Sequence, residues 1–328
     1  MLKLLIWEVM RIFVTGASGC VGHYVSETLI NNTDHELFLL VRDPAKLKVD
    51  TSVRSGVNVV KGDMNEIGEL ADLLKTIDVP VLTAAGWGGP SALAVNYTKT
   101  HELLNLLDPQ VCKQVIYFAT ESILNSKNEL LPEAGSIGTE YIQSKHRCFS
   151  SLHESAVADR ITTVFPTLVL GGDENKPYSF LSADLPMVTK YAGLLRWIKA
   201  DGSFHFIHGK DIAEVVRYLI DHPEEAAKYD RKVVMGNELV YVDKGIQEIC
   251  EYLGKPVIFQ VPISIGIINI IIKLFKIEMA PWDYFCLQNR HFKHDPIVNP
   301  RTFGLPSYVA SLTDVLSTRG IPKFQEKP

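Results

Sequence analysis

The chain contains 328 residues, of which 46% are hydrophobic and 22% charged, and its formal net charge is −5. That hydrophobic content suffices for a packed core and excludes a wholly disordered chain. The negative balance, with no basic block, argues against nucleic acid or an anionic membrane as the main partner. The five cysteines are scattered and odd in number. They predict a reducing compartment, and we expect a cytoplasmic protein.

Two apolar stretches raise the question of a targeting or membrane segment. Residues 1–9 lack a small-residue cleavage pattern, so we expect no signal peptide there. Residues 263–275 form the most apolar run, but they are too short to cross a bilayer and include Lys273. We therefore expect no stable membrane insertion. A buried or substrate-lining helix is favoured over a helix on a membrane surface.

From residue 11 onward, short apolar runs rich in β-branched residues alternate with helical patterns. Strands are expected at 11–16, 36–42, 57–63, 79–85, 114–120 and 161–170. Helices are expected at 21–31, 64–76, 96–107 and 139–155, and a short strand with an amphipathic helix at 204–222. This alternation predicts an α/β fold of the Rossmann type, in which a doubly wound parallel sheet is buried on both faces.

The alternation stops near residue 171, and prolines are frequent after 240. Residues 10–171 and about 204–239 are expected to form the dinucleotide-binding Rossmann domain. About 172–203 and 240–328 are expected to form a smaller, mostly helical C-terminal region that binds the substrate.

The stretch VTGASGCVG places three glycines, Gly16, Gly19 and Gly22, between the first strand and the first helix. In a dinucleotide-binding loop the first glycine permits the turn, the second lets the backbone approach a pyrophosphate, and the third permits close helix packing. The helix N-terminus then offers free N–H groups and a partial positive charge to the phosphates. The pattern therefore predicts a bound dinucleotide.

The end of the second expected strand discriminates between the two nicotinamide dinucleotides. An acidic residue there would hold the ribose hydroxyls of NAD, whereas FLLVRDP places Arg42 at this point. A guanidinium suits the 2′-phosphate of NADP. We therefore predict NADP, and the adjacent Asp43 keeps NAD as the alternative.

GTEYIQSKHR contains Tyr141 and Lys145, which lie one turn apart on the same face of the expected helix. A free tyrosine has a pKa of about 10 and is a poor acid or base at neutral pH. A nearby ammonium stabilises the phenolate, so we expect Lys145 to lower the Tyr141 pKa toward neutrality. The pair then exchanges a proton with a substrate oxygen while a hydride moves to or from the nicotinamide. Thr120 and Ser122, at the end of the preceding strand, are the candidates for holding that oxygen.

Together these motifs resemble the extended short-chain dehydrogenase/reductase family, which includes NAD(P)-dependent epimerases and dehydratases. The resemblance covers most of residues 10–215 and rests on TGASGCVG, GDM, TAAG, NYTKT, YFATESIL, YIQSK, FPTLVLG and FHFIHGKDIAE. It implies that Tyr141 is the general acid or base, that Lys145 also holds the nicotinamide ribose, and that Thr120 rather than Ser122 binds the substrate oxygen. The complete predicted cofactor site comprises Gly16, Ser18, Gly19, Cys20, Val21, Gly22, Arg42, Asp63, Met64, Ala84, Ala85, Gly86, Tyr141, Lys145, Pro166 and Thr167.

The resemblance also implies individual roles within that site. Asp63 would bond the adenine amine, and Met64 would pack beside it. Residues 84–86 would line the adenine-side ribose and the diphosphate, whereas Pro166 and Thr167 would border the nicotinamide. A homodimer through two helices is usual in the family.

The sequence departs from the nucleotide-sugar branch of that family. A single acid, Glu121, follows Thr120 where the sugar dehydratases carry an Asp-Glu pair. The C-terminal region offers Arg290 and Arg301 for a nucleotide diphosphate and is otherwise rich in Ile, Phe and Trp. We therefore expect an NAD(P)-dependent oxidoreductase that acts on a carbonyl or secondary alcohol of a small, rather apolar substrate.

Two alternatives stay open: a nucleotide-sugar epimerase or dehydratase, and a non-catalytic NADP-binding sensor or assembly factor. The intact Thr-Tyr-Lys set argues against the sensor.

The pairs His205/His208 and His291/His294 lack a carboxylate or cysteine at ligand spacing, so we expect no metal site. Trp87, in the sequence GWGGP, either covers the nicotinamide or substrate or packs as an ordinary core residue.

Overall fold

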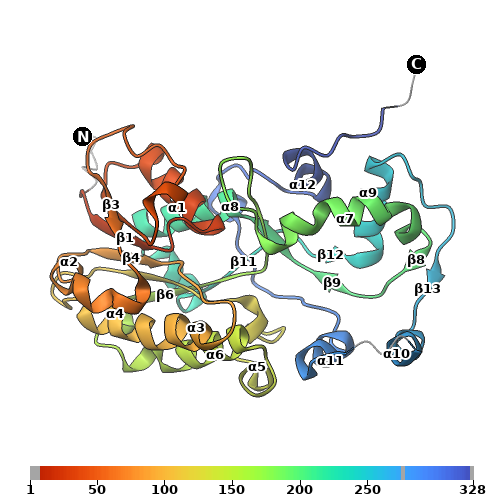
Figure 1. Ribbon diagram of the computed structural model, residues 1–328, viewed down its shortest axis with the longest axis horizontal. Coiled ribbons are helices and arrows are strands. Elements are labelled where there is room, and N and C mark those ends of the chain that lie inside the picture. Colours follow the sequence, from red (N-terminus) through yellow and green to blue (C-terminus); the bar gives the residue numbers. More distant parts are fainter. Residues whose placement is uncertain (1–7, 275–277, 326–328) are drawn as a thin grey trace.

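The computed structural model describes residues 8–274 and 278–325. Its centre is a seven-stranded sheet in the order β11-β6-β5-β4-β1-β2-β3, in which every neighbouring pair is parallel (Figure 1). The strands are β1 Arg11–Thr15, β2 Glu36–Val41, β3 Val57–Lys61, β4 Val79–Leu82, β5 Val115–Phe118, β6 Ile161–Pro166 and β11 Lys232–Met235. The predicted Rossmann-type, doubly wound sheet is confirmed.

The strand sequences explain why the sheet is buried on both faces. In β1, Ile12, Phe13 and Val14 are all fully buried. Ile12 and Val14 belong to the core shared with α1 (Cys20–Asn32) and α8 (Gly209–Asp221), whereas Phe13 belongs to the core on the opposite face. Because alternating side chains are all apolar, both faces need a helical cover.

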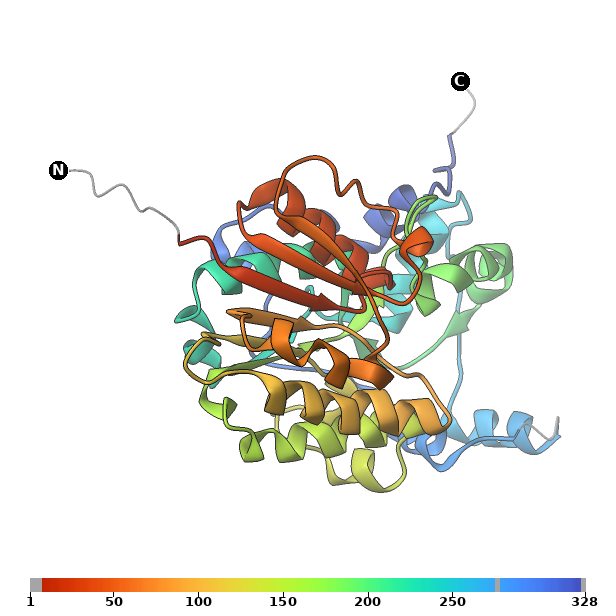
Figure 2. The same ribbon diagram turned by 60° about the vertical axis from the view of Figure 1, so that its left-hand side comes forward.

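Helices cover the sheet in two layers, which Figure 2 shows from the side. α1 and α8 pack against each other on one face. The other face carries α2 (Ala71–Leu74), α4 (Thr100–Leu106) and α6 (Glu140–Ser151). A π-helical turn over Ala94–Lys99 leads into α4, after the short helix α3 (Pro90–Leu93).

The position of the site follows from the strand order. From β1 the chain moves outward through β2 and β3, and from β4 it moves in the other direction through β5, β6 and β11. Neighbouring strands β1 and β4 therefore form the switch point at which ligands bind in open parallel sheets. The loops that follow β1, β4 and β5 meet at this edge.

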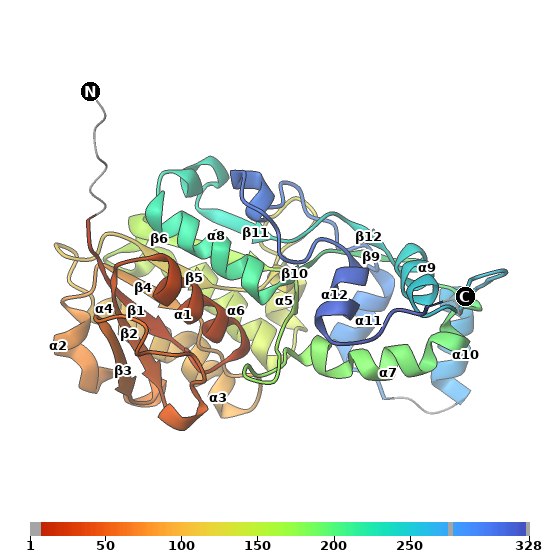
Figure 3. The ribbon, with the colours of Figure 1, turned by 90° about the horizontal axis from the view of Figure 1, so that it is seen from above.

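A second group of elements follows the carboxyl end of β6 and lies at one end of the molecule (Figure 3). Its helices are α7 Phe180–Leu195, α9 Val242–Tyr252, α10 Ile265–Leu274, α11 Pro281–Gln288 and α12 Leu312–Thr318. Its short paired strands are β7 Leu168–Leu170 with β10 Phe206–His208, β9 Ser203–Phe204 with β12 Val240–Tyr241, and β8 Ile198–Lys199 with β13 Val261–Pro262. A separate small core, which includes Phe206, Val309 and Leu312, joins α7, α9 and α12, whereas Trp282 of α11 packs into the core of the central sheet.

Several elements differ from the sequence-based expectation. The expected strand 161–170 breaks at Thr167, because both its N–H and its hydroxyl donate to the Met235 carbonyl and β7 then turns toward β10. The expected helix 64–76 begins as a 3₁₀ helix over Met64–Leu70. The edge strand β11 and helix α7, which contains Pro186, were not predicted.

The apolar run 263–275 also differs from expectation. Its described part includes α10, where Ile270 and Leu274 are 66% and 72% exposed, so a fully buried helix is wrong, whereas the start of the run lines a cavity, as the substrate-lining alternative allows. Within residues 8–274 and 278–325, no helix combines the length and hydrophobicity needed to span a bilayer. Most of the apolar stretch 1–9, for which no signal peptide is expected, lies outside the described residues.

Candidate active site

The glycine-bearing turn connects β1 to α1. Gly16 has φ +67°, a conformation that favours glycine, and a Cβ there would lie 2.8 Å from the backbone of Ala84. A Cβ at Gly22 would lie 2.1 Å from the Gly16 carbonyl oxygen. The turn and the close packing predicted for the first and third glycines are therefore both present.

The N-terminus of α1 carries no cap from a side chain. Its N-cap residue, Gly19, is exposed, and the first turn, which includes Cys20 and Val21, holds no acid. First-turn N–H groups without a cap attract anions, so a pyrophosphate fits here. Ser18 is half-buried on the same turn. Burial raises the pKa of the Cys20 thiol to about 12, which keeps the thiol neutral at this position.

Arg42 and Asp43 follow β2 but differ in their hydrogen bonds to the rest of the chain. Asp43 accepts a hydrogen bond from the Ala45 N–H at 3.1 Å and thereby caps the 3₁₀ turn Pro44–Lys46. Arg42 is exposed and makes no hydrogen bond or ion pair with another described residue. The guanidinium is thus available to a ligand, whereas the carboxylate is occupied by its own turn.

Asp63 and Met64 lie just beyond the end of β3. Asp63 accepts two hydrogen bonds from Asn65, at 2.8 Å from the backbone N–H and at 3.0 Å from the side chain, and both use Oδ1. Its Oδ2 therefore retains the capacity to accept a bond from an amine. Met64 is 8% exposed and packs into the sheet core.

The loop after β4 lies directly beside the glycine turn. The Ala84 N–H donates to Thr15 Oγ1 at 3.2 Å, and Thr83 Oγ1 donates to the Thr15 carbonyl at 2.5 Å. Ala84 and Ala85 are half-buried at this junction. The structure thus brings the predicted phosphate loop together with the residues predicted to line the ribose.

Gly86, which follows in the same loop, is held by a residue to which the sequence analysis assigned no role. Asn96 is fully buried and accepts a hydrogen bond from the Gly86 N–H at 2.9 Å. Its side-chain amide donates to the Gly86 carbonyl at 2.7 Å and to Ser144 Oγ at 2.9 Å. Asn96 therefore fixes the loop to α6. The NYTKT motif contains it, but sequence spacing does not reveal its partners.

Thr120 and Tyr141 meet at the carboxyl edge of the sheet. Thr120 follows β5, and Tyr141 lies in the first turn of α6. A hydrogen bond joins their side chains. Thr120 Oγ1 also donates to Ser122 Oγ at 3.3 Å. The three hydroxyl groups predicted to act on or near a substrate oxygen are therefore adjacent.

Lys145 lies one turn after Tyr141, as predicted, and is 2% exposed. Its Nζ donates to the Phe118 carbonyl at 2.7 Å and lies 5.0 Å from the centre of the Tyr117 ring. Burial lowers the pKa of Lys145 to about 8. The amine is therefore anchored to β5 and titrates near physiological pH.

The pKa of Tyr141 differs from the expected value. Burial raises it to about 12, the hydrogen bond from Thr120 lowers it, and the charge of Glu121 raises it. Lys145 is not among the groups that shift it, because its Nζ is directed to the Phe118 carbonyl. The expected lowering toward neutrality is therefore wrong for this structure, and the phenol stays protonated at neutral pH.

A buried pair of an acid and an imidazole lies beside these hydroxyls. Glu121 is 8% exposed, and its Oε2 lies 3.5 Å from His294 Nε2. His294 also bonds Asn128 through Nδ1 at 2.9 Å and donates its backbone N–H to His205 Nε2 at 3.3 Å. The pair fixes the C-terminal segment to the loop after β5. Its members are far apart in the chain, so the sequence did not reveal it.

Pro166 and Thr167, predicted to border the nicotinamide, are both buried where β6 ends. The Thr167 hydroxyl donates to the Met235 carbonyl at 2.9 Å. The Thr167 side chain therefore joins β6 to β11, and its hydroxyl proton takes part in this hydrogen bond.

Trp87 stacks on Tyr141, with ring centres 4.7 Å apart and planes inclined by 21°. It is 74% exposed, which excludes ordinary core packing. The nearby Gly89 N–H donates to Glu140 Oε2 at 2.5 Å, so the loop is tied to the start of α6. Trp87 therefore covers the ring of the predicted acid–base residue.

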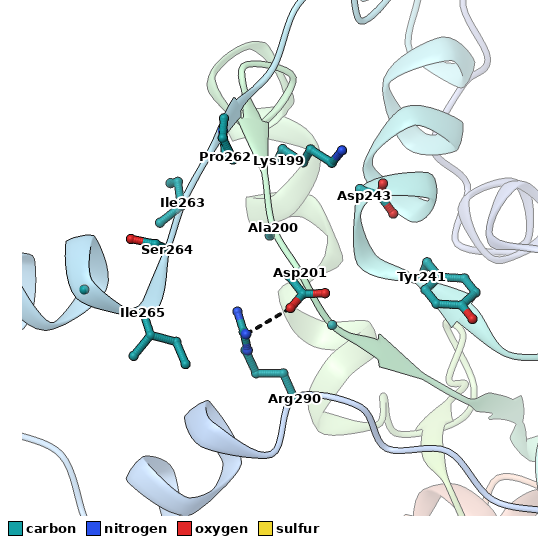
Figure 4. A pocket seen from close by; sticks show the side chains of 12 residues that line it. Lys199, Ala200, Asp201, Tyr241, Asp243, Pro262, Ile263, Ser264, Ile265 and Arg290 are labelled. Carbon is teal, nitrogen blue, oxygen red and sulfur yellow. Dashed lines mark ion pairs between the residues drawn. The ribbon is translucent and has the colours of Figure 1, made fainter.

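A cavity of about 590 Å³ lies among β8, β13 and the start of α10 (Figure 4). Arg290 lines it and pairs with Asp201 at 2.9 Å. Arg301, the other candidate for a diphosphate, is exposed in the 3₁₀ turn Pro300–Phe303 and does not line this cavity. Across the described parts of the chain, no cluster of three or more His, Cys, Asp or Glu residues could hold a metal ion.

Solved structures with this fold include several nucleotide-binding enzymes. WbmG from Bordetella bronchiseptica, in complex with NAD, is 15% identical, with 98% of each chain covered and a TM-score of 0.62. The terminal R domain of the myxalamid PKS-NRPS pathway is 17% identical over 98% of this chain and 88% of that one, with a TM-score of 0.65. A double mutant of DesIV, a dTDP-glucose 4,6-dehydratase from Streptomyces venezuelae with NAD bound, is 15% identical over 94% of this chain and 96% of that one, with a TM-score of 0.62. At such identities the likeness shows the fold.

The family assignment comes from the sequence itself. No curated protein matches the chain. The profile of the NAD-dependent epimerase/dehydratase family matches residues 12–236, which include the glycine turn, the Thr120–Tyr141–Lys145 cluster and all seven strands of the sheet. The chain therefore belongs to the NAD-dependent epimerase/dehydratase family.

Proposed function

We propose that this protein is an NADP-dependent oxidoreductase that transfers a hydride to or from a carbonyl or secondary alcohol of a small, rather apolar substrate. The observation that carries this proposal is the convergence of Thr120, Tyr141 and Lys145 at the end of β5. Family membership supports a nicotinamide cofactor and an oxidoreductase, dehydratase or epimerase reaction. Residues 172–203 and 240–328 would form the walls of the substrate site.

The residues around the glycine turn fit a dinucleotide. When bound, it would supply or accept the hydride. The uncapped N-terminus of α1 would hold the pyrophosphate, Asp63 Oδ2 the adenine amine, and Lys145 the nicotinamide ribose. NADP is favoured because Arg42 is unengaged, whereas the Asp43 carboxylate caps its own turn.

Tyr141 would hold the proton that is exchanged with the substrate oxygen. Its raised pKa, about 12, keeps the phenol protonated at neutral pH, and a protonated phenol is a donor. In the reduction direction this phenol would donate its proton to the carbonyl oxygen, and in the oxidation direction the phenolate would take the proton from the alcohol. Thr120 would hold the same oxygen, and Trp87 would shield the reacting groups from water.

Replacement of Tyr141 by phenylalanine tests this role, because it removes the proton but keeps the ring that stacks on Trp87. We expect substrate-dependent NADPH oxidation, screened over small apolar aldehydes and ketones, to fall about 100-fold or more. NADPH binding, measured by fluorescence titration, should be retained. The matched control is Tyr229→Phe, which lies at the end of a 3₁₀ helix preceding β11. Full turnover in Tyr141→Phe would refute the assigned role.

A nucleotide-sugar epimerase or dehydratase is the second candidate. Its support is Glu121, a buried acid that directly follows Thr120, although the Asp-Glu pair of the sugar dehydratases is reduced here to this one acid. The pairing of Arg290 with Asp201 also weighs against a diphosphate. A ligand at 100 times its Kd stabilises a protein by about 2.7 kcal/mol. We expect NADPH, and neither UDP-glucose nor dTDP-glucose, to raise the melting temperature. Stabilisation by a sugar nucleotide would favour the second candidate.

A further inference from the structure

Helix α7 exposes an apolar stripe. Phe180, Met187, Tyr191 and Leu194 are between 48% and 81% exposed. Their spacing places them on one face of the helix. The helix packs against α9, so this stripe faces away from the body of the molecule.

Helix α10 is mostly apolar, and its polar residues Asn269 and Lys273 lie one turn apart on one face. Ile267, Ile270 and Leu274 are 43%, 66% and 72% exposed, and Lys273 is the one charged residue of the helix. Ile265, Ile268 and Ile272 are half-buried, whereas the described residues leave the three side chains above exposed. An exposed apolar face of this kind is stabilised where something other than water covers it.

The two helices are linked through a pair of short strands. Strand β8, which follows α7, pairs with β13, which precedes α10. The Val261 N–H donates to the Trp197 carbonyl at 2.8 Å, and both side chains are exposed. Seen from above, α7 and α10 lie on the same side of the C-terminal region (Figure 3), and in Figure 1 α7 lies above and α10 below the β8–β13 pair. We call the α7 stripe, Trp197, Val261 and the exposed residues of α10 the apolar surface.

Positive charge accompanies the apolar surface, although two acids, Asp201 and Asp243, line the cavity beside Lys199 and the start of α10. Residues 180–199 and 255–274 contain one acid, Asp184, and five basic residues: Lys190, Arg196, Lys199, Lys255 and Lys273. None of these five makes an ion pair within the described chain. The net charge of −5 argues against an anionic membrane as a partner, but the local charge has the opposite sign.

We propose that the apolar surface docks the protein onto an anionic lipid membrane as a peripheral contact. Apolar and aromatic side chains would enter the headgroup region, while the cations meet lipid phosphates. α10 has ten residues, a length of about 15 Å, so it lies on a bilayer and does not cross it.

A second copy of the chain is a poorer occupant. In a two-fold symmetric contact the same surface faces itself, which would bring like charges together. Docking on lipid also suits an apolar substrate, but it does not depend on the proposed reaction.

Co-sedimentation of the full chain with vesicles tests the proposal. We expect binding to vesicles of phosphatidylcholine with one-third phosphatidylglycerol, weaker binding at high salt, and little binding to pure phosphatidylcholine. Ile270→Glu should reduce partitioning more than about tenfold, and Lys273→Glu about fivefold or more. The matched controls are Val53→Glu, with Val53 55% exposed in the loop before β3, and Lys127→Glu, an exposed lysine.

The replaced side chains are exposed, so melting curves of all four variants should match that of the wild type. Three results would overturn the proposal. One is equal binding by the Ile270 and Val53 variants. Another is equal binding to neutral and anionic vesicles. The third is a concentration-dependent dimer that Ile270→Glu dissociates, which would show that a second copy covers this surface.

Discussion

Tyr141 has two neighbours that act on its proton in opposite directions. The Thr120 hydroxyl stabilises the phenolate through a hydrogen bond, whereas the Glu121 carboxylate destabilises it through charge repulsion. Lys145, which the sequence placed correctly one turn away, binds a backbone carbonyl instead. Helical spacing could predict which residues share a face, but it could not predict where a flexible lysine directs its amine or that burial controls the phenol.

Replacement of Glu121 by glutamine should lower the pKa of Tyr141, because the carboxylate raises it. We expect the apparent pKa that governs turnover to fall relative to the wild type. The pH profile of kcat/KM measures it, with Glu133→Gln, an exposed acid on α5 (Pro132–Ser136), as the control. An unchanged or higher pKa in Glu121→Gln would contradict the electrostatic role.

Two glycines that lie inside helices allow the effect of close packing on stability to be distinguished from the effect of helix propensity. In Gly22→Ala of α1 the new methyl group would lie 2.1 Å from the Gly16 carbonyl oxygen. This oxygen belongs to the backbone of the glycine turn, so it cannot move without distorting the turn. In Gly193→Ala of α7 it would meet no atom within 4 Å. We expect Gly22→Ala to destabilise the protein by about 1–3 kcal/mol or more, and Gly193→Ala to stabilise it by about 0.5–1 kcal/mol.

Urea unfolding curves of the two variants measure the difference. Gly22→Ala should also lose NADPH binding, because the shift in the turn moves the first-turn N–H groups of α1. Equal stability of the two variants would mean that the glycine turn is not tightly packed.

At the scale of elements, the sequence predicts six of the seven strands of the central sheet and the glycine turn, because β-branched runs and glycine spacing are local signals. It does not predict β11, a four-residue edge strand, or α7, whose pattern is interrupted by Pro186. The burial expected for 263–275 is wrong because hydrophobicity alone does not tell which surface a helix meets. The Glu121–His294 pair depends on tertiary contacts that no local pattern contains.

At the scale of the whole molecule, the sheet order places the loops after β1, β4 and β5 at one edge. The C-terminal region begins at the same end of β6. It supplies His294 to that edge of the sheet. The proposed reaction and the proposed lipid contact therefore use different parts of the molecule. The first depends on the switch point of the sheet, and the second depends on the outer side of α7 and α10.

A crystal structure of the complex with NADPH tests the central claim most directly. We predict the pyrophosphate on the N–H groups of the first turn of α1, and the 2′-phosphate beside Arg42. The nicotinamide should lie next to Tyr141, with the hydroxyl about 3 Å from the position of a substrate oxygen. A nicotinamide bound away from Tyr141, or a phosphate that does not contact the glycine turn, would contradict the account.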